Sequence, residues 1–212
     1  MIIYCAADPI YFNLYFDLWA SQLNKFYPEH YKLVALYKPT KESFDKCNNY
    51  GVTSVDVTDL FPQNPRKEHF YLLRWLGLPY YKNVNILSTQ VNCLAVKKQI
   101  FPESINVDQW RIQRPKKGAL GGVSAAIFTP QAAEKVVMQA KTMIDNPPET
   151  DHPMNMWQIE NLSQHLEKCE HQIKEKDLIS EENLPDYTCW ITARTSNTWS
   201  HEKKLEALRK FI

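Results

Sequence analysis

The sequence has few glycines and no dense cysteine pattern, and each absence excludes a class of protein. Five glycines occur among 212 residues, where average usage would give about 15. A collagen-like chain, or one built mainly of tight hairpins, is therefore excluded. The five cysteines are odd in number, widely spaced and without a Cys-x-x-Cys pair, so they indicate neither a disulfide framework nor a zinc site. We expect a reducing, cytoplasmic setting.

Long hydrophobic runs and an excess of one charge are also missing. No stretch of about 18 apolar residues occurs, and the first residues lack the basic and apolar regions of a signal peptide. We therefore expect neither a membrane span nor a secretory leader. Lys and Arg number 25 against 24 Asp and Glu, for a net charge of +1. This balance offers no long-range field to attract nucleic acid and leaves only local basic clusters for that role.

Apolar runs and helical periodicity alternate along the chain, and no linker-like run divides it, so we expect one domain over residues 1–212. The alternation predicts an α/β fold with a mainly parallel central sheet covered on both faces. Expected strands are 2–6, 33–37, 52–57, 83–87, 123–128 and one within 186–194. Expected helices are 11–26, 40–50, 67–76, 130–144, 154–170 and a charged tail at 202–212.

Two segments stand out as ligand-binding loops. Polar residues 88–92 follow the run 83–87, and the carboxyl ends of strands are where open α/β sheets bind ligands. Three of the five glycines, Gly118, Gly121 and Gly122, lie within five residues, which indicates either close approach to a ligand or an ordinary tight turn. The adjacent Lys116 and Lys117 add local positive charge.

Several of these segments resemble, in order, the nucleotide-sugar glycosyltransferases of the GT-A fold. Residues 5–21 (CAADPIYFNLYFDLWAS) resemble the opening strand, loop and helix of that family. Residues 71–79 (YLLRWLGLP) resemble its helix carrying an Arg before the central strand, and 83–91 fall where the family has a strand and an Asp-x-Asp motif. Residues 118–128 resemble the acceptor-side strand, and Asp151 with His152 stands where an acidic residue often begins a helix beneath the acceptor.

The resemblance implies a GT-A-like, Rossmann-like three-layer sandwich with a nucleotide-binding half at 1–95 and an acceptor-side half and tail at 96–212. It implies transfer of a sugar from a nucleoside-diphosphate sugar to a hydroxyl of a polysaccharide, a protein or a modified DNA base. Two further readings stay open: an inactive module that still binds a nucleotide sugar, and a nucleic-acid-binding protein on the same fold. The near-zero net charge counts against the second.

The sequence departs from the family where a metal would bind. A divalent ion needs hard oxygen ligands to bridge the diphosphate, and Ser88 and Gln90 stand in place of the two carboxylates. Three options follow: a metal-independent transferase, one whose Mn²⁺ or Mg²⁺ is held by residues such as Asp8 or His201, or an inactive relative. Without a metal, cationic side chains would have to stabilise the diphosphate, and the candidates are Arg74, Lys116, Lys117, Arg194 and Lys203.

The resemblance assigns roles to three groups of residues. Donor-binding candidates are Asp8, Tyr11, Arg74, Ser88, Thr89, Gln90, His201 and Lys203. Acceptor-binding candidates are Lys116, Lys117, Gly121 and Gly122. Asp151 is the candidate base for the acceptor hydroxyl, with His152 orienting it or acting in its place. Most have a structural alternative: Asp8 and Asp151 as helix caps, Arg74 as a snorkelling side chain or the partner of Glu68, residues 88–90 as a plain turn, and His201 as an exposed helix start.

Overall fold

The computed structural model describes residues 1–70, 72–78, 83–101, 105, 107–113, 125–147, 164–173, 184–193 and 199–212. Its main sheet has seven strands in the order β3-β2-β1-β4-β7-β6-β8. Among these described strands, only β7 runs antiparallel to its neighbours, which confirms the predicted α/β fold with a mainly parallel sheet. The strands are β1 (Ile2–Ala7), β2 (Tyr31–Leu36), β3 (Thr53–Asp56), β4 (Ile86–Thr89), β6 (Gln109–Gln113), β7 (Ala125–Phe128) and β8 (Gln164–Lys168).

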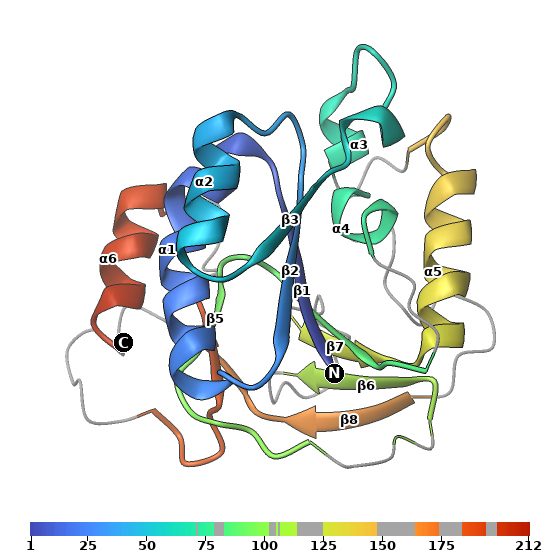
Figure 1. Cartoon of the computed structure of the whole chain (residues 1–212). Coiled ribbons are helices and arrows are strands. Elements are labelled where there is room, and N and C mark those ends of the chain that lie inside the picture. Colours follow the sequence, from blue (N-terminus) through green and yellow to red (C-terminus); the bar gives the residue numbers. More distant parts are fainter. Residues whose placement is uncertain are drawn as a thin grey trace.

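Helices cover both faces of this sheet (Figure 1). One face carries α1 (Pro9–Phe26), α2 (Lys41–Asn49) and α6 (His201–Arg209); the other carries α3 (Lys67–Phe70), α4 (Leu73–Leu76) and α5 (Pro130–Thr142). A 3-10 turn, η1 (Thr58–Leu60), follows β3. Within the described residues, no helix combines the length and the apolar character needed to cross a bilayer.

The two faces of β1 explain why the sheet is buried on both sides. Ile3 and Cys5 pack toward α1, whereas Ile2 and Tyr4 pack toward α4 and α5. Because side chains alternate along a strand, a continuous apolar run fills both cores at once. The sequence pattern of residues 2–6 therefore predicts a strand buried on both faces, as is found.

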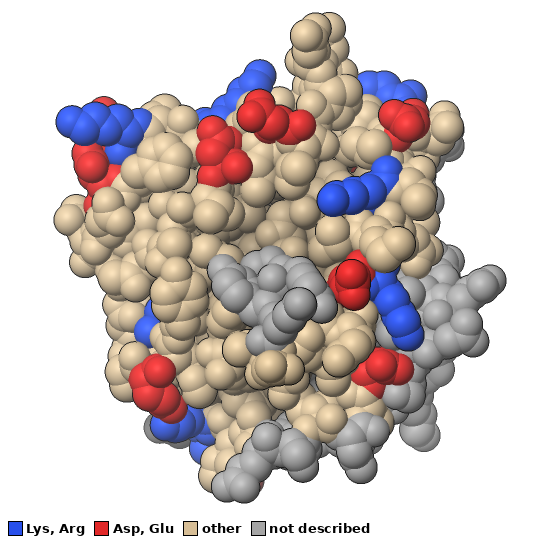
Figure 2. Space-filling model, turned by 45° about the vertical axis from the view of Figure 1, so that its right-hand side comes forward, with Lys and Arg blue, Asp and Glu red and all other residues tan. Residues whose placement is uncertain are grey.

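Charged side chains are mixed over the face in Figure 2, where Lys and Arg lie among Asp and Glu. No single-sign patch dominates the described part of this face. This distribution agrees with the nearly balanced composition.

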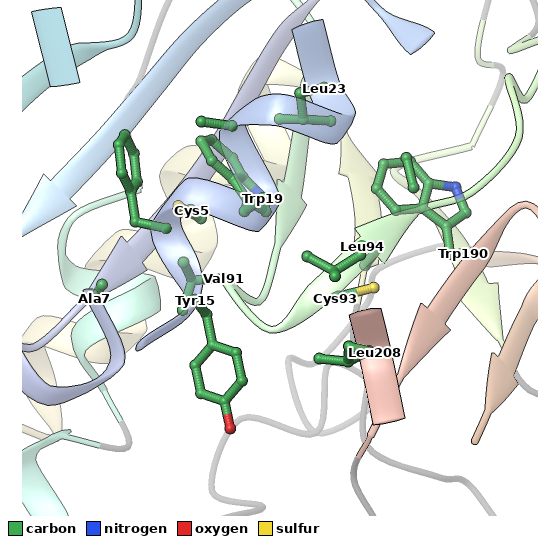
Figure 3. Packing of buried hydrophobic residues seen from close by; sticks show 14 of the residues in the cluster. Cys5, Ala7, Tyr15, Trp19, Leu23, Val91, Cys93, Leu94, Trp190 and Leu208 are labelled. Carbon is green, nitrogen blue, oxygen red and sulfur yellow. The ribbon is translucent and has the colours of Figure 1, made fainter. Parts of the chain in front are cut away.

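A second sheet of three short strands extends the core on the α1 side. It consists of β5 (Cys93–Ala95), β10 (Trp190–Thr192) and β9 (Glu170–Gln172), in that order. Figure 3 shows Leu94 of β5 and Trp190 of β10 in the same cluster as Trp19 and Leu23 of α1. These four side chains are fully buried, so the small sheet holds α1 against the main sheet.

Two predicted helices are wrong in the described residues. Residues 67–76 form two one-turn helices, α3 and α4, instead of one. The predicted helix 154–170 ends in strands: Gln164–Lys168 is β8 and Glu170 begins β9. The reason is non-local, because β8 pairs in parallel with β6 and β9 with β10. Strands β5 and β6 were not predicted.

Candidate active site

The loops that follow β1 and β4 leave the sheet at the same edge. The two strands are parallel neighbours, with Ile2 opposite Ile86 and Tyr4 opposite Ser88. Strand β2 also ends there, since Ala7 lies opposite Leu36. We call this the carboxyl edge, defined by Ala7, Leu36 and Thr89. It is the edge where α/β sheets bind ligands, and it brings the segments at Asp8 and Gln90 together.

Asp8 caps the first helix at the carboxyl edge. Its Oδ1 accepts a hydrogen bond from the Tyr11 backbone N–H at 2.9 Å, and Pro9 occupies the first helical position. Asp and Pro at these places are typical of a helix start. Asp8 therefore does act as a helix cap, the structural alternative to ligand binding. The residue is also half-buried at the carboxyl edge, where α/β sheets bind ligands.

The last helix brings His201 to the same place. His201 Nδ1 lies 3.0 Å from the Tyr15 hydroxyl, 186 residues away in sequence. Its ring also meets Tyr11 edge-on, with centroids 5.4 Å apart. Ser200 caps this helix by accepting from the Lys203 backbone N–H, and Lys203 Nζ lies 4.8 Å from the Trp199 ring centroid. Sequence reasoning did not assign Tyr15 to the site, although it follows Tyr11 by one helical turn.

The Tyr15 hydroxyl makes stability sensitive to alkaline pH. Burial, followed by the effects of Tyr11 and Glu202, raises the pKa of Tyr15 from its ordinary value of 10.0 to about 12. The unfolded chain therefore loses this proton first as pH rises, and the contribution of Tyr15 is present below pH 10 and lost between pH 10 and about 12. We expect the stability difference between wild type and Tyr15→Phe to shrink across that range in urea unfolding. A constant difference would contradict this assignment.

Arg74 of α4 is held against β4. Its Nε donates to Ser88 Oγ at 2.8 Å, and Nη2 donates to the Ser88 carbonyl oxygen at 2.5 Å. The guanidinium carbon lies 4.7 Å from the Trp75 ring centroid, and the Tyr4 hydroxyl donates to the Arg74 carbonyl oxygen at 3.1 Å. These contacts determine both the direction of the side chain and the position of its short helix.

Arg74 remains charged at neutral pH despite its surroundings. Burial lowers the pKa of Arg74 to about 10, while Cys93, Tyr4, Cys5 and Glu170 oppose that fall. Glu170 lies on β9 with its side chain buried, and its Oε1 accepts from Thr192 Oγ1 at 3.0 Å. The sequence pattern placed Glu170 at the end of a predicted helix, 154–170, and so did not identify this buried carboxylate.

The expected polar loop begins two residues later than predicted. Ser88 and Thr89 belong to β4 and are fully buried, and Gln90 is the first residue beyond the strand. Their hydroxyls are accommodated because partners exist: Thr89 Oγ1 accepts from Trp19 Nε1 at 2.8 Å and donates to the Tyr4 carbonyl oxygen at 3.4 Å. Gln90, half-buried, is thus the residue of the three that reaches the carboxyl edge.

Residues 88–90, where the resemblance places the metal-binding motif, do not fit a divalent metal ion. The described part of the chain contains no group of three His, Cys, Asp or Glu side chains arranged to hold one. Both Ser88 oxygens accept hydrogen bonds from a guanidinium, and Gln90 offers only a neutral amide. Mn²⁺ or Mg²⁺ prefers anionic hard oxygens, and binding at Ser88 would place it directly beside another cation.

The remaining predicted residues lie outside the described part of the chain. They are Lys116, Lys117, Gly121 and Gly122 on the acceptor side, Arg194 as a candidate cation, and Asp151 and His152 as catalytic candidates. Their roles stay predictions.

Comparison with known proteins gives a match in three dimensions only. No family model matches the sequence, and no curated protein sequence is significantly similar to it. The galactosyltransferase LgtC, solved in complex with donor and acceptor sugar analogs, superposes with a TM-score of 0.63 at 11% identity, covering 100% of this chain and 94% of LgtC. An active-site mutant of LgtC gives a TM-score of 0.62, also at 11% identity, covering 99% of this chain and 95% of the mutant.

A second similar structure is the glycosyltransferase GlyE of Streptococcus pneumoniae TIGR4. It has a TM-score of 0.64 at 10% identity and covers 100% of this chain but 60% of GlyE. Identity this low establishes architecture alone. The chain therefore has the GT-A fold of these glycosyltransferases.

Proposed function

We propose that this chain transfers a sugar from a nucleoside-diphosphate sugar to a hydroxyl acceptor. The observation that carries the proposal is the parallel register of β1 and β4, which brings Asp8, Tyr11 and Gln90 to one edge of a GT-A fold. His201 reaches the same place from the last helix. The complex of LgtC with donor and acceptor sugar analogs supports a sugar-nucleotide ligand for this architecture.

Most of the donor-binding candidates have a defined role in this proposal. The Asp8 carboxylate accepts a hydrogen bond from a ribose hydroxyl or a base amide, and the exposed Tyr11 ring packs against the nucleoside. Arg74, His201 and Lys203 face the diphosphate, where positive charge stabilises the leaving group. Thr89 acts through packing, because its hydroxyl bonds to Trp19 and Tyr4 inside the core.

The reaction forms one bond and breaks another at the anomeric carbon of the sugar. The acceptor oxygen bonds to that carbon, and the bond from carbon to diphosphate oxygen breaks, its electron pair leaving with the diphosphate. The acceptor proton passes to a base, for which the sequence proposes Asp151, assisted or replaced by His152. Lys116, Lys117, Gly121 and Gly122 are proposed to contact the acceptor, which is a polysaccharide, a protein or a modified DNA base. Positioning and leaving-group stabilisation supply most of the rate.

Asp8→Asn tests this site directly. Asparagine caps helices about as well as aspartate, so we expect little change in melting temperature without ligand. We expect a loss of the thermal stabilisation that nucleoside diphosphates and their sugars give the wild type, because a bound ligand stabilises in proportion to its saturation. The measurement is a thermal-shift screen over uridine, guanosine, cytidine, adenosine and thymidine diphosphates and their sugars.

The Asp8→Ala variant serves as the control for the cap. It should lower stability by about 1 kcal/mol through the lost Tyr11 N–H contact, whether or not Asp8 binds a ligand. If no nucleotide stabilises the wild type, the proposed function is wrong. If Asp8→Asn binds as the wild type does, Asp8 is only a cap.

A second candidate function is a module that binds the nucleotide sugar without turning it over. The observation favouring it is the Ser88–Arg74 hydrogen bond, which stands where the resemblance implies a metal-binding carboxylate. Donor hydrolysis and transfer assays separate the two candidates, since tight nucleotide binding with no turnover supports the module.

A further inference from the structure

We propose that the guanidinium of Arg74 takes the place of the divalent cation and holds the donor diphosphate at the carboxyl edge. This inference rests on the proposed function of the same site. Its starting point is the mismatch between the metal that the fold family implies and the oxygens that this chain presents at Ser88 and Gln90.

Arg74 is positioned before any ligand arrives. Two hydrogen bonds fix its guanidinium on Ser88, the Trp75 ring supports one side, and the Tyr4 hydroxyl holds its backbone carbonyl. A cation fixed in this way loses little conformational freedom on binding. A guanidinium also has a planar fork of donors that matches phosphate oxygens.

Arg74 also brings a guanidinium to a partly buried position. The Arg74 residue is half-buried beside Ser88, the next-to-last residue of β4. Both of its hydrogen bonds to Ser88 go to neutral oxygens, which orient the guanidinium. Partial burial also lowers the local dielectric, which strengthens attraction to a diphosphate relative to an exposed cation.

Arg74 and a metal ion exclude each other at Ser88. Ser88 Oγ and the Ser88 carbonyl oxygen already accept from Arg74, and the Thr89 hydroxyl is bonded within the core. A divalent ion at this position would have to displace the guanidinium or lie against it. Serine at position 88 therefore serves to orient a protein cation.

Calorimetric titration of nucleoside diphosphates into the intact chain tests the inference, using the diphosphate that gives the largest thermal shift. We expect the wild-type affinity to change by less than about twofold between EDTA and excess Mn²⁺. Arg74→Met should weaken binding by about 10-fold or more, because it removes charged hydrogen bonds. Arg66→Met is the matched control: Arg66 is exposed and precedes α3, and its loss should leave affinity unchanged.

Arg74→Lys keeps the charge without the planar fork, and it provides a second variant should Arg74→Met fail to fold. We expect it to bind more weakly than wild type and still without need of metal. The paramagnetic resonance signal of Mn²⁺ gives an independent readout. Wild type should leave this signal unchanged, whereas Gln90→Asp, which adds a carboxylate at the edge, should reduce it.

The outcomes separate this inference from the proposed function. Wild-type binding that EDTA abolishes, or Mn²⁺ bound by wild type as strongly as by Gln90→Asp, would overturn the inference and leave the function standing. Unchanged affinity in both Arg74 variants would overturn it as well. A wild type that binds none of the nucleoside diphosphates would overturn the proposed function and the inference together.

Discussion

Trp19→Ala should lower the free energy of unfolding by about 3–5 kcal/mol, the usual cost of truncating a buried tryptophan. Trp19 is fully buried in the middle of α1, among Cys5, Leu23 and Leu94 of the core cluster. The change opens a cavity between α1 and the main sheet and removes the hydrogen bond to Thr89. Urea unfolding at neutral pH measures the loss.

Two further variants separate the contribution of the Trp19 hydrogen bond from that of its buried side chain. Thr89→Val preserves shape but leaves the Trp19 N–H buried without its acceptor, which should cost about 1–3 kcal/mol. Met138→Ala is the control for a large apolar side chain at the surface, 63% exposed, and should change stability by less than about 0.5 kcal/mol. A Trp19→Ala loss no greater than that of Met138→Ala would show that α1 does not pack as described.

Gly77→Ala should destabilise the protein by about 1–3 kcal/mol and also reduce nucleotide binding. An added Cβ would lie 2.8 Å from the Ala35 Cβ and 2.8 Å from the Tyr4 hydroxyl, closer than van der Waals contact. Both neighbours belong to buried strands, so α4 must shift instead. Because α4 carries Arg74 and is held by the Tyr4 hydroxyl, the shift should loosen the Ser88 contacts. Urea unfolding and nucleotide titration measure the two effects.

Gly51→Ala is the control: replacing this glycine should also destabilise the protein, but through backbone strain and not through a steric clash. Its φ is +66° with nothing near an added Cβ, so alanine there should cost about 1 kcal/mol through backbone strain. Gly51 follows α2, away from Arg74, and nucleotide affinity should stay the same. Equal nucleotide affinity in Gly77→Ala and wild type would show that α4 does not position the Arg74 guanidinium for binding.

The first third of the fold was predictable because its signals are local. Apolar runs correspond to β1 and β2, the predicted strand 52–57 contains β3, helical spacing corresponds to α1, and a left-handed glycine follows α2 at Gly51. Asp8 and Pro9 indicated a break after β1, and the structure shows there the cap of α1. Each of these features depends on residues within a few positions of one another, so the pattern alone specifies them.

The later strands were not predictable in the same way. β8 has the sequence Gln-His-Leu-Glu-Lys, which shows neither an apolar run nor a clear alternation. Its strand conformation depends on pairing with β6, more than fifty residues earlier. The strands β5 and β9 are similarly short, and both form their hydrogen bonds with β10. Their hydrogen-bonding partners lie far away in sequence, where periodicity carries no information.

Local sequence patterns and parallel strand pairing are enough to specify the order of strands and helices at the start of the chain. They also specify the polar segments that follow β1 and β4. The burial of Ser88 and Thr89, in contrast, depends on tertiary packing, since their partners Arg74 and Trp19 lie 14 and 70 residues away. The contact between His201 and Tyr15, which are 186 residues apart in sequence, depends on tertiary packing as well. A buried hydroxyl is stable only with a hydrogen-bonding partner, and that partner is supplied by packing rather than by sequence neighbours.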